Sequence, residues 1–246
     1  MSLNSSTKKA VSWVGLTLWA VVSLVAGQTI AGVILLNAPL STNQNIQTTI
    51  GAALGYCIAL VIAIGLKPLI TKQKPDKKTL GIGRLPSWMD IGLGVLSVLP
   101  YYLLAGVVVW LGISVLKVID PSVGQQIAFT SVYARIDYAV AFITFVVLAP
   151  LAEELLFRGY LLGNLSEKGS RWLAVIVTAV VFGFLHAPGF TEAGVVWQWG
   201  AAADTFALAI VAGSLRVTTK NIWAGVILHA IKNAIAFYFL FIVPML

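Results

Sequence analysis

The chain has 246 residues, of which 59% are hydrophobic and only 10% are charged, and its mean hydropathy is +0.93. Soluble domains carry about 25% charged residues, so this composition excludes a soluble protein. It indicates an all-α, polytopic helical membrane protein whose first partner is the lipid bilayer. The net charge of +7 does not indicate nucleic acid, because no basic stripe with interleaved aromatic residues lies on a soluble module.

Seven apolar segments separated by polar loops predict about seven transmembrane helices. In chain order they are 11–36, 48–70, 91–118, 138–165, 172–188, 198–215 and 222–244. The first segment is too long for a signal peptide, so we expect it to be retained as a helix. The sequence contains no internal repeat. We divide it into 1–90, two N-terminal helices with a basic loop, and 91–246, the membrane core.

The placement of the basic residues predicts the orientation in the membrane. Twelve of the sixteen Lys and Arg residues fall on one side of the predicted spans, and only Lys117 and Arg135 fall on the other. Cytoplasmic loops carry the excess of positive charge, so we expect a cytoplasmic N-terminus in a bacterial plasma membrane. The basic stretch 72–84 is interpreted as a cytoplasmic loop that touches anionic lipid head groups.

Three of the predicted spans contain the ionisable or amide side chains that we consider candidates for function. These residues are Glu153, Glu154 and Arg158 in one span, His186 in the next, and His229 and Asn233 in the last. Ionisable groups at membrane depth are costly and are candidates for function. From the helical rise, Glu153 lies roughly 20 Å and His186 roughly 22 Å from the turn between their spans. His229 and Asn233 lie roughly 12–20 Å from the same surface. We therefore expect these groups to meet in a polar cavity inside the membrane.

The spacing of these residues suggests their roles. Glu154 and Arg158 are four residues apart on one helical face and can form an ion pair, while Glu153 points about 100° away. His229 and Asn233 share another face, so both can point at one ligand atom. Pro150, one turn before the two acids, should kink its helix or release a backbone carbonyl.

Peptide hydrolysis needs a base to activate water and donors to hold the oxyanion, and the polar groups include both. The sequence has no His-Glu-x-x-His zinc motif and no Gly-x-Gly-Asp motif. We interpret Ser214 as a packing residue, and Asp204 with Lys232 as a structural pair.

At these motifs the sequence resembles the CPBP family of intramembrane glutamic endopeptidases, the CAAX prenyl endopeptidase type II-like group that includes bacteriocin-processing and immunity (Abi) proteins. The family pattern is Glu-Glu-x-x-x-Arg, Phe-x-x-x-His and His-x-x-x-Asn, in that order on separate membrane helices. Here the second motif is formed by Phe182 and His186, and the resemblance covers about 138–236.

The resemblance implies a glutamate-dependent protease that uses no metal and no cofactor. It implies that Glu153 and His186 activate water, that His229 and Asn233 form the oxyanion hole, and that Glu154 and Arg158 support the site. We expect an endopeptidase that cuts a membrane-associated or lipidated peptide and is reached from the cytoplasm. Family members are associated with prenylated proteins, bacteriocin maturation and self-immunity, so the substrate stays open. The sequence carries no signal for the oligomeric state.

Other functions fit the same residues. A non-catalytic immunity or scaffold protein could bind a partner in the same cavity. A metal-dependent hydrolase could use the two histidines and two glutamates as zinc ligands. A transporter is disfavoured because the repeat symmetry is missing.

Overall fold

The computed structural model describes residues 4–66, 76–129, 132–191 and 194–245. The N-terminal elements are α1 (Ser5–Asn37), α2 (Gln44–Leu60) and η1 (Val61–Gly65), followed by α4 (Trp88–Leu96), α5 (Val98–Trp110) and η2 (Leu111–Val115). Next come α6 (Arg135–Phe142), η3 (Ile143–Leu148), α7 (Ala149–Glu154), η4 (Leu155–Leu161), α8 (Leu162–Lys168) and α9 (Arg171–Leu185). The last are β1 (Pro188–Thr191), β2 (Gly194–Trp197), α10 (Trp199–Thr219), α11 (Trp223–Phe237), η5 (Tyr238–Ile242) and η6 (Val243–Met245).

The fold is that of a polytopic helical membrane protein. Within the described residues, six helical segments are long and apolar enough to cross a membrane. They are Thr7–Asn37, Gln44–Gly65, Trp88–Val115, Arg135–Lys168, Trp199–Thr219 and Trp223–Ile242. The shorter apolar helix α9 occupies the position of the fifth predicted span. Helices therefore form at all seven predicted places, although 67–70 of the second span lies outside the described residues. The division at residue 90 stays a prediction.

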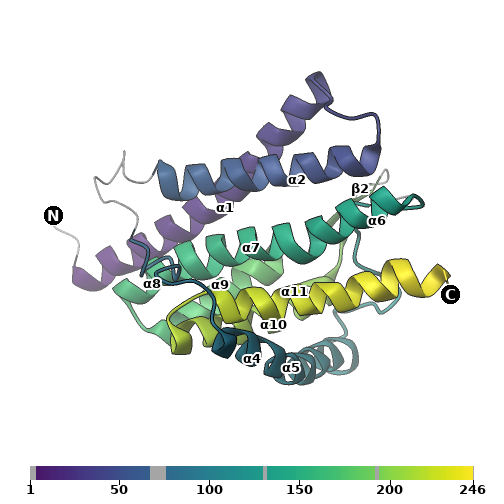
Figure 1. Cartoon of the computed structure of the whole chain (residues 1–246). Helices are drawn as coiled ribbons and strands as arrows, with labels where there is room; N and C mark the ends of the chain where they lie inside the picture. The colour runs from purple at the N-terminus through teal and green to yellow at the C-terminus, as the bar shows by residue number, and fades with distance from the viewer. Residues whose placement is uncertain (1–3, 67–75, 130–131, 192–193, 246) are drawn as a thin grey trace.

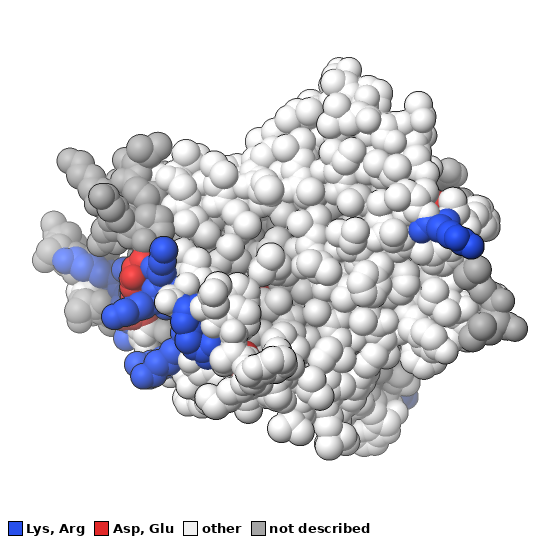
Figure 2. Space-filling model, in the orientation of Figure 1, with Lys and Arg blue, Asp and Glu red and all other residues white. Residues whose placement is uncertain are grey.

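The helices lie side by side with two distinct ends (Figure 1). α8 and the N-terminus lie at one end, and β2 and the C-terminus lie at the other. Lys and Arg side chains gather at the α8 end, and a broad belt of the visible face between the two ends carries almost none (Figure 2). We call the α8 end the basic end. The cations that define it are Lys78, Arg84, Arg171, Arg216 and Lys220. This distribution is the one expected for a protein whose middle faces lipid.

α9 and α10 form a tight helical hairpin in the membrane core. Gly183 of α9 faces α10 so closely that a Cβ atom there would lie 2.7 Å from the carbonyl oxygen of Ala202. A side chain at this position would push the helices apart, so glycine permits their approach. The close packing holds the C-terminal end of α9, with His186 as its cap residue, in the interior.

A short β-hairpin joins α9 to α10 at the end opposite the basic end. β1 and β2 pair antiparallel, with Pro188 opposite Trp197 and Thr191 opposite Gly194. The rings of Trp197 and Trp199 stack with centroids 5.5 Å apart. This hairpin end (188–197) was not predicted from the sequence, because two strands of four residues leave no hydropathy signal next to long helices.

Candidate active site

The buried ion pair between Glu154 and Arg158 lies at the base of the site. Arg158 Nη1 is 2.9 Å from Glu154 Oε1, and neither side chain is more than 1% exposed. The i, i+4 pairing predicted from the sequence is thus confirmed. Glu154 Oε1 also lies 3.2 Å from Nδ1 of His229, which comes from α11. Gly225 leaves the room for this approach, since a Cβ there would lie 3.0 Å from Glu154 Oε2.

Glu154 therefore orients the imidazole ring of His229. With Nδ1 directed at Glu154, the other ring nitrogen, Nε2, faces Glu153 at 3.9 Å from Oε2. A carboxylate accepts hydrogen bonds and does not donate, so Nδ1 carries the proton. Nε2 can donate to a third group only when the ring is doubly protonated.

Glu153 is held by a residue that the sequence did not point to. The hydroxyl of Tyr56, on α2, donates a hydrogen bond of 2.5 Å to Glu153 Oε1. Oε2 is left facing Nε2 of His229. Tyr56 lies 97 positions before Glu153 and outside the three motifs, so no local spacing could have found it. A tyrosine in the middle of a predicted span was the only available signal.

His186 is oriented by the backbone of its own helix. Its Nδ1 lies 2.8 Å from the carbonyl oxygen of Phe182 and must donate, since a carbonyl only accepts. In the neutral ring, Nε2 is then a free acceptor. No hydrogen bond joins His186 to Glu153 in the part of the chain that the structure describes, so their predicted cooperation would require a bridging water or substrate.

Phe182 packs at the centre of the site. Its ring centroid lies 4.6 Å from that of His186 and 6.1 Å from that of His229, and the guanidinium carbon of Arg158 lies 4.5 Å from it. These contacts are those of a packing residue, although Phe182 is part of the second motif. Its face also offers the buried arginine a favourable cation–π contact.

Asn233 is held by a carbonyl that Pro150 sets free. In η3 the N–H of Ala149 bonds to the carbonyl of Thr144, five residues back. The next bond in this register would join residue 150 to the carbonyl of Phe145, but proline has no N–H. Asn233 Nδ2 donates to that carbonyl at 2.8 Å instead. The predicted release of a carbonyl by Pro150 is confirmed, and the second amide hydrogen of Asn233 remains for a ligand.

One cavity of about 410 Å³ joins these groups. Four of the six predicted residues line it: Glu153, His186, His229 and Asn233. Glu154 and Arg158 lie behind its wall. The volume lies in the range of pockets that bind small ligands. The polar intramembrane cavity predicted from the sequence is therefore present.

The cavity extends from the motif residues toward the hairpin end. Its further lining comes from α1, α2 and η5, including Gln28, Thr48 and Phe241. A second cavity of about 300 Å³ shares His186 and Gln125 with it and is lined by the strand residue Phe190. The lining of the two cavities thus reaches the hairpin end and includes none of the five residues that define the basic end. The cytoplasmic access expected from the sequence stays a prediction.

Two further predictions concern residues near the cavity. Lys232 Nζ pairs with Asp204 at 3.1 Å, and Tyr101 donates a hydrogen bond of 2.5 Å to the same aspartate, which confirms the predicted structural pair. Ser214 bonds to the carbonyl of Ile210 within α10 at 2.7 Å, as expected of a packing residue. Among the described residues, no three His, Cys, Asp or Glu side chains converge in the manner of metal ligands.

Comparison with known proteins relates the chain to a family of endopeptidases and to a protein named as a putative membrane peptidase. Residues 135–235 match the family described as type II CAAX prenyl endopeptidase Rce1-like. A Bacillus subtilis (strain 168) protein named "Putative membrane peptidase YdiL" is 30% identical over 87 residues, which are 35% of this chain. The match spans about a third of that relative, 32% of its length. No solved structure matches the chain.

Proposed function

We propose that this protein, whose residues 135–235 match the type II CAAX prenyl endopeptidase Rce1-like family, is a glutamate-dependent intramembrane endopeptidase. The observation that carries the proposal is that Glu153, His186, His229 and Asn233, from three separate helical segments, line one cavity within the membrane core. Its substrate would be a membrane-associated or lipidated peptide. The phenylalanines of the cavity wall provide an apolar surface for such a chain.

In this mechanism Glu153 and His186 activate a water molecule. Tyr56 occupies Glu153 Oε1, so Oε2 faces the cavity, and His186 presents Nε2 as an acceptor. One of the two takes a proton from water as the oxygen attacks the peptide carbonyl. The same proton then passes to the leaving amine when the C–N bond breaks.

His229 and Asn233 would hold the oxyanion that forms during the attack. His229 would donate from Nε2 in its doubly protonated form, with Nδ1 directed at Glu154, and Asn233 would donate its second amide hydrogen. Both donors are fixed before substrate binds, one by Glu154 and the other by the Phe145 carbonyl. Donors that need no reorganisation stabilise developing charge most effectively.

The test is cleavage of candidate peptides by the full-length protein reconstituted in liposomes. We expect Glu153→Gln to lower kcat by about 10²- to 10⁴-fold, as loss of a general base does. Ser214→Ala, which changes a packing hydroxyl outside the cavity, is the matched control and should retain turnover. Full activity of Glu153→Gln would contradict the proposed mechanism. Peptide binding without turnover in the unmutated protein would instead favour the scaffold or immunity function.

A further inference from the structure

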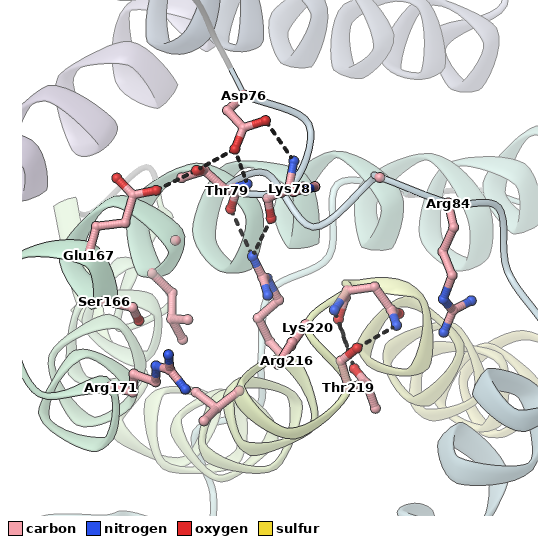
Figure 3. A pocket seen from close by; sticks show the side chains of 15 residues that line it. Asp76, Lys78, Thr79, Arg84, Ser166, Glu167, Arg171, Arg216, Thr219 and Lys220 are labelled. Carbon is pink, nitrogen blue, oxygen red and sulfur yellow. Dashed lines mark hydrogen bonds between the residues drawn. The ribbon is translucent and has the colours of Figure 1, made fainter.

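A separate cavity, of about 590 Å³, lies at the basic end, and none of the six motif residues lines it. Three connections meet around it: the loop 76–84, the α8–α9 turn with Glu167 and Arg171, and the α10–α11 turn with Arg216 and Lys220. Figure 3 shows Arg216 reaching from its helix to the loop, and Arg171 and Lys220 near it. The cavity thus connects the ends of the helices that carry the candidate active site.

Basic side chains outnumber acidic ones around this cavity. Its cations are Lys78, Arg84, Arg171, Arg216 and Lys220, and its acids are Asp76 and Glu167. Only Arg84 has a carboxylate partner, Asp90 at 2.6 Å. Within the described part of the chain, the other four cations form no ion pair.

The two acids are engaged in holding the loop. Asp76 accepts hydrogen bonds from the backbone N–H groups of Lys78 and Thr79 at 3.2 and 3.3 Å. The N–H of Lys78 is the main cause that lowers the pKa of Asp76, so this acid stays ionised in its turn. Glu167 accepts a hydrogen bond from the hydroxyl of Thr79. Two acids among four cations without an ion pair leave a net positive charge around the cavity.

Arg216 is a buried cation without a counter-ion. It is 8% exposed, and its Nη2 donates to the carbonyl oxygens of Lys78 and Thr79 at 3.2 and 2.8 Å. Its Nε has no hydrogen-bond partner among the described residues. Buried charges are normally paired, because an uncompensated one is costly. A bound anion would supply the missing charge.

The walls of the cavity are preformed. The carbonyl of Thr79 approaches Gly163 so closely that a Cβ there would lie 2.1 Å away, which only glycine permits. On the other side, the N–H of Ile222 donates to the carbonyl of Gly81 at 3.0 Å. The backbone of the loop is therefore fastened to both helical hairpins.

We propose that this cavity binds the phosphate group of an anionic ligand at the membrane surface. Arginine and lysine bind phosphate oxygens through charge-assisted hydrogen bonds. Basic pockets between transmembrane helices on the cytoplasmic side are suited to lipid head groups, and a free phosphate compound offers the same chemistry. The bound phosphate bridges the three connections and stabilises the packing of α8, α9, α10 and α11.

The experiment measures the thermal unfolding midpoint of the full-length protein in phosphatidylcholine nanodiscs. One arm adds phosphatidylglycerol to the discs, and the other titrates inorganic phosphate. The triple variant Lys78→Gln, Arg171→Gln, Lys220→Gln should weaken the apparent affinity by on the order of 100-fold. The control removes three cations of the same end that do not line the cavity: Lys8→Gln, Lys9→Gln, Lys77→Gln. It should lose less than about threefold.

Stabilisation by phosphatidylglycerol alone identifies a lipid head group, and stabilisation by inorganic phosphate alone identifies a soluble ligand. Equal losses in the triple variant and the control would overturn the proposal, because diffuse surface charge would then explain them. The absence of stabilisation in both arms would also overturn it. If the triple variant does not fold, Arg171→Gln and Lys220→Gln singly carry the same comparison, with an expected loss of about fivefold each.

Discussion

At the scale of single residues, the candidate site depends on hydrogen bonds that fix each polar group before substrate arrives. Tyr56 is the clearest case, because its hydroxyl leaves only one oxygen of Glu153 directed at the cavity. It comes from α2, outside the region that matches the peptidase family. The N-terminal helices therefore contribute to the site and do not merely anchor the protein.

We expect Tyr56→Phe to lower kcat by about 10- to 100-fold, because a hydrogen bond to a charged group is lost. The fold should be retained, since the ring stays. KM should change less than about twofold, as a positioning residue acts on the base and not on the substrate. Steady-state kinetics in liposomes checks this, with Tyr102→Phe, an exposed tyrosine on α5, as the control. Unchanged kcat in Tyr56→Phe would remove Tyr56 from the mechanism.

The Glu154–Arg158 ion pair stabilises the folded protein and is also part of the candidate site. Glu154→Gln leaves Arg158 charged and almost fully buried, so we expect a loss of about 3–5 kcal/mol in the free energy of unfolding. Denaturant unfolding in detergent measures it. The double variant Glu154→Gln, Arg158→Leu removes the orphaned charge and should recover part of the loss. A double variant that is less stable than Glu154→Gln would contradict this account.

At the scale of elements, the helix around Pro150 is joined to α11 by one hydrogen bond. Proline leaves the Phe145 carbonyl without a backbone donor, and Asn233 takes its place. The π-helical segments η3 and η4 on either side of α7 alter the angular relation of residues along this helix.

We expect Pro150→Ala to lower kcat by about tenfold without destabilising the protein. Alanine supplies an N–H that competes with Asn233 for the Phe145 carbonyl and restores a helical hydrogen bond. The decisive measurement is the double-mutant cycle with Asn233→Ala. If both changes act through the same hydrogen bond, Pro150→Ala should have little further effect once Asn233 is gone. Independent, multiplying effects would argue against the link.

The sequence predicted helices at all seven places and four of the residues that line the cavity, because hydropathy and i, i+4 spacing are local signals. Glu154 with Arg158 was predictable for that reason. The contact of Tyr56 with Glu153 and the contact of His229 with Glu154 were not, since each joins helices distant in sequence. The same holds for the partner of the released carbonyl: the sequence predicted that Pro150 would free a carbonyl, but not that Asn233 would donate a hydrogen bond to it.

At the scale of the whole molecule, the basic residues and the candidate active-site cavity lie toward opposite ends of the helices. Lys and Arg gather at the basic end (Figure 2), whereas the lining of the candidate active-site cavity reaches toward the hairpin end. The positive-inside rule places the basic end in the cytoplasm. We therefore propose that substrate reaches the cavity from the outer side, which favours exported or surface-anchored peptides over cytoplasmic ones.

Two measurements test this access together. With Cys57→Ser as background, a membrane-impermeant thiol reagent applied to intact cells should label Val195→Cys in β2 and not Lys220→Cys. In liposomes of known orientation, a peptide added on the hairpin side should be cleaved at least about tenfold faster than one added on the basic side. Faster cleavage from the basic side would reject access through the hairpin end and leave the protease mechanism standing. Labelling of Lys220→Cys alone would reverse the orientation, and the cavity would then open to the cytoplasm, where a prenylated substrate could reach it.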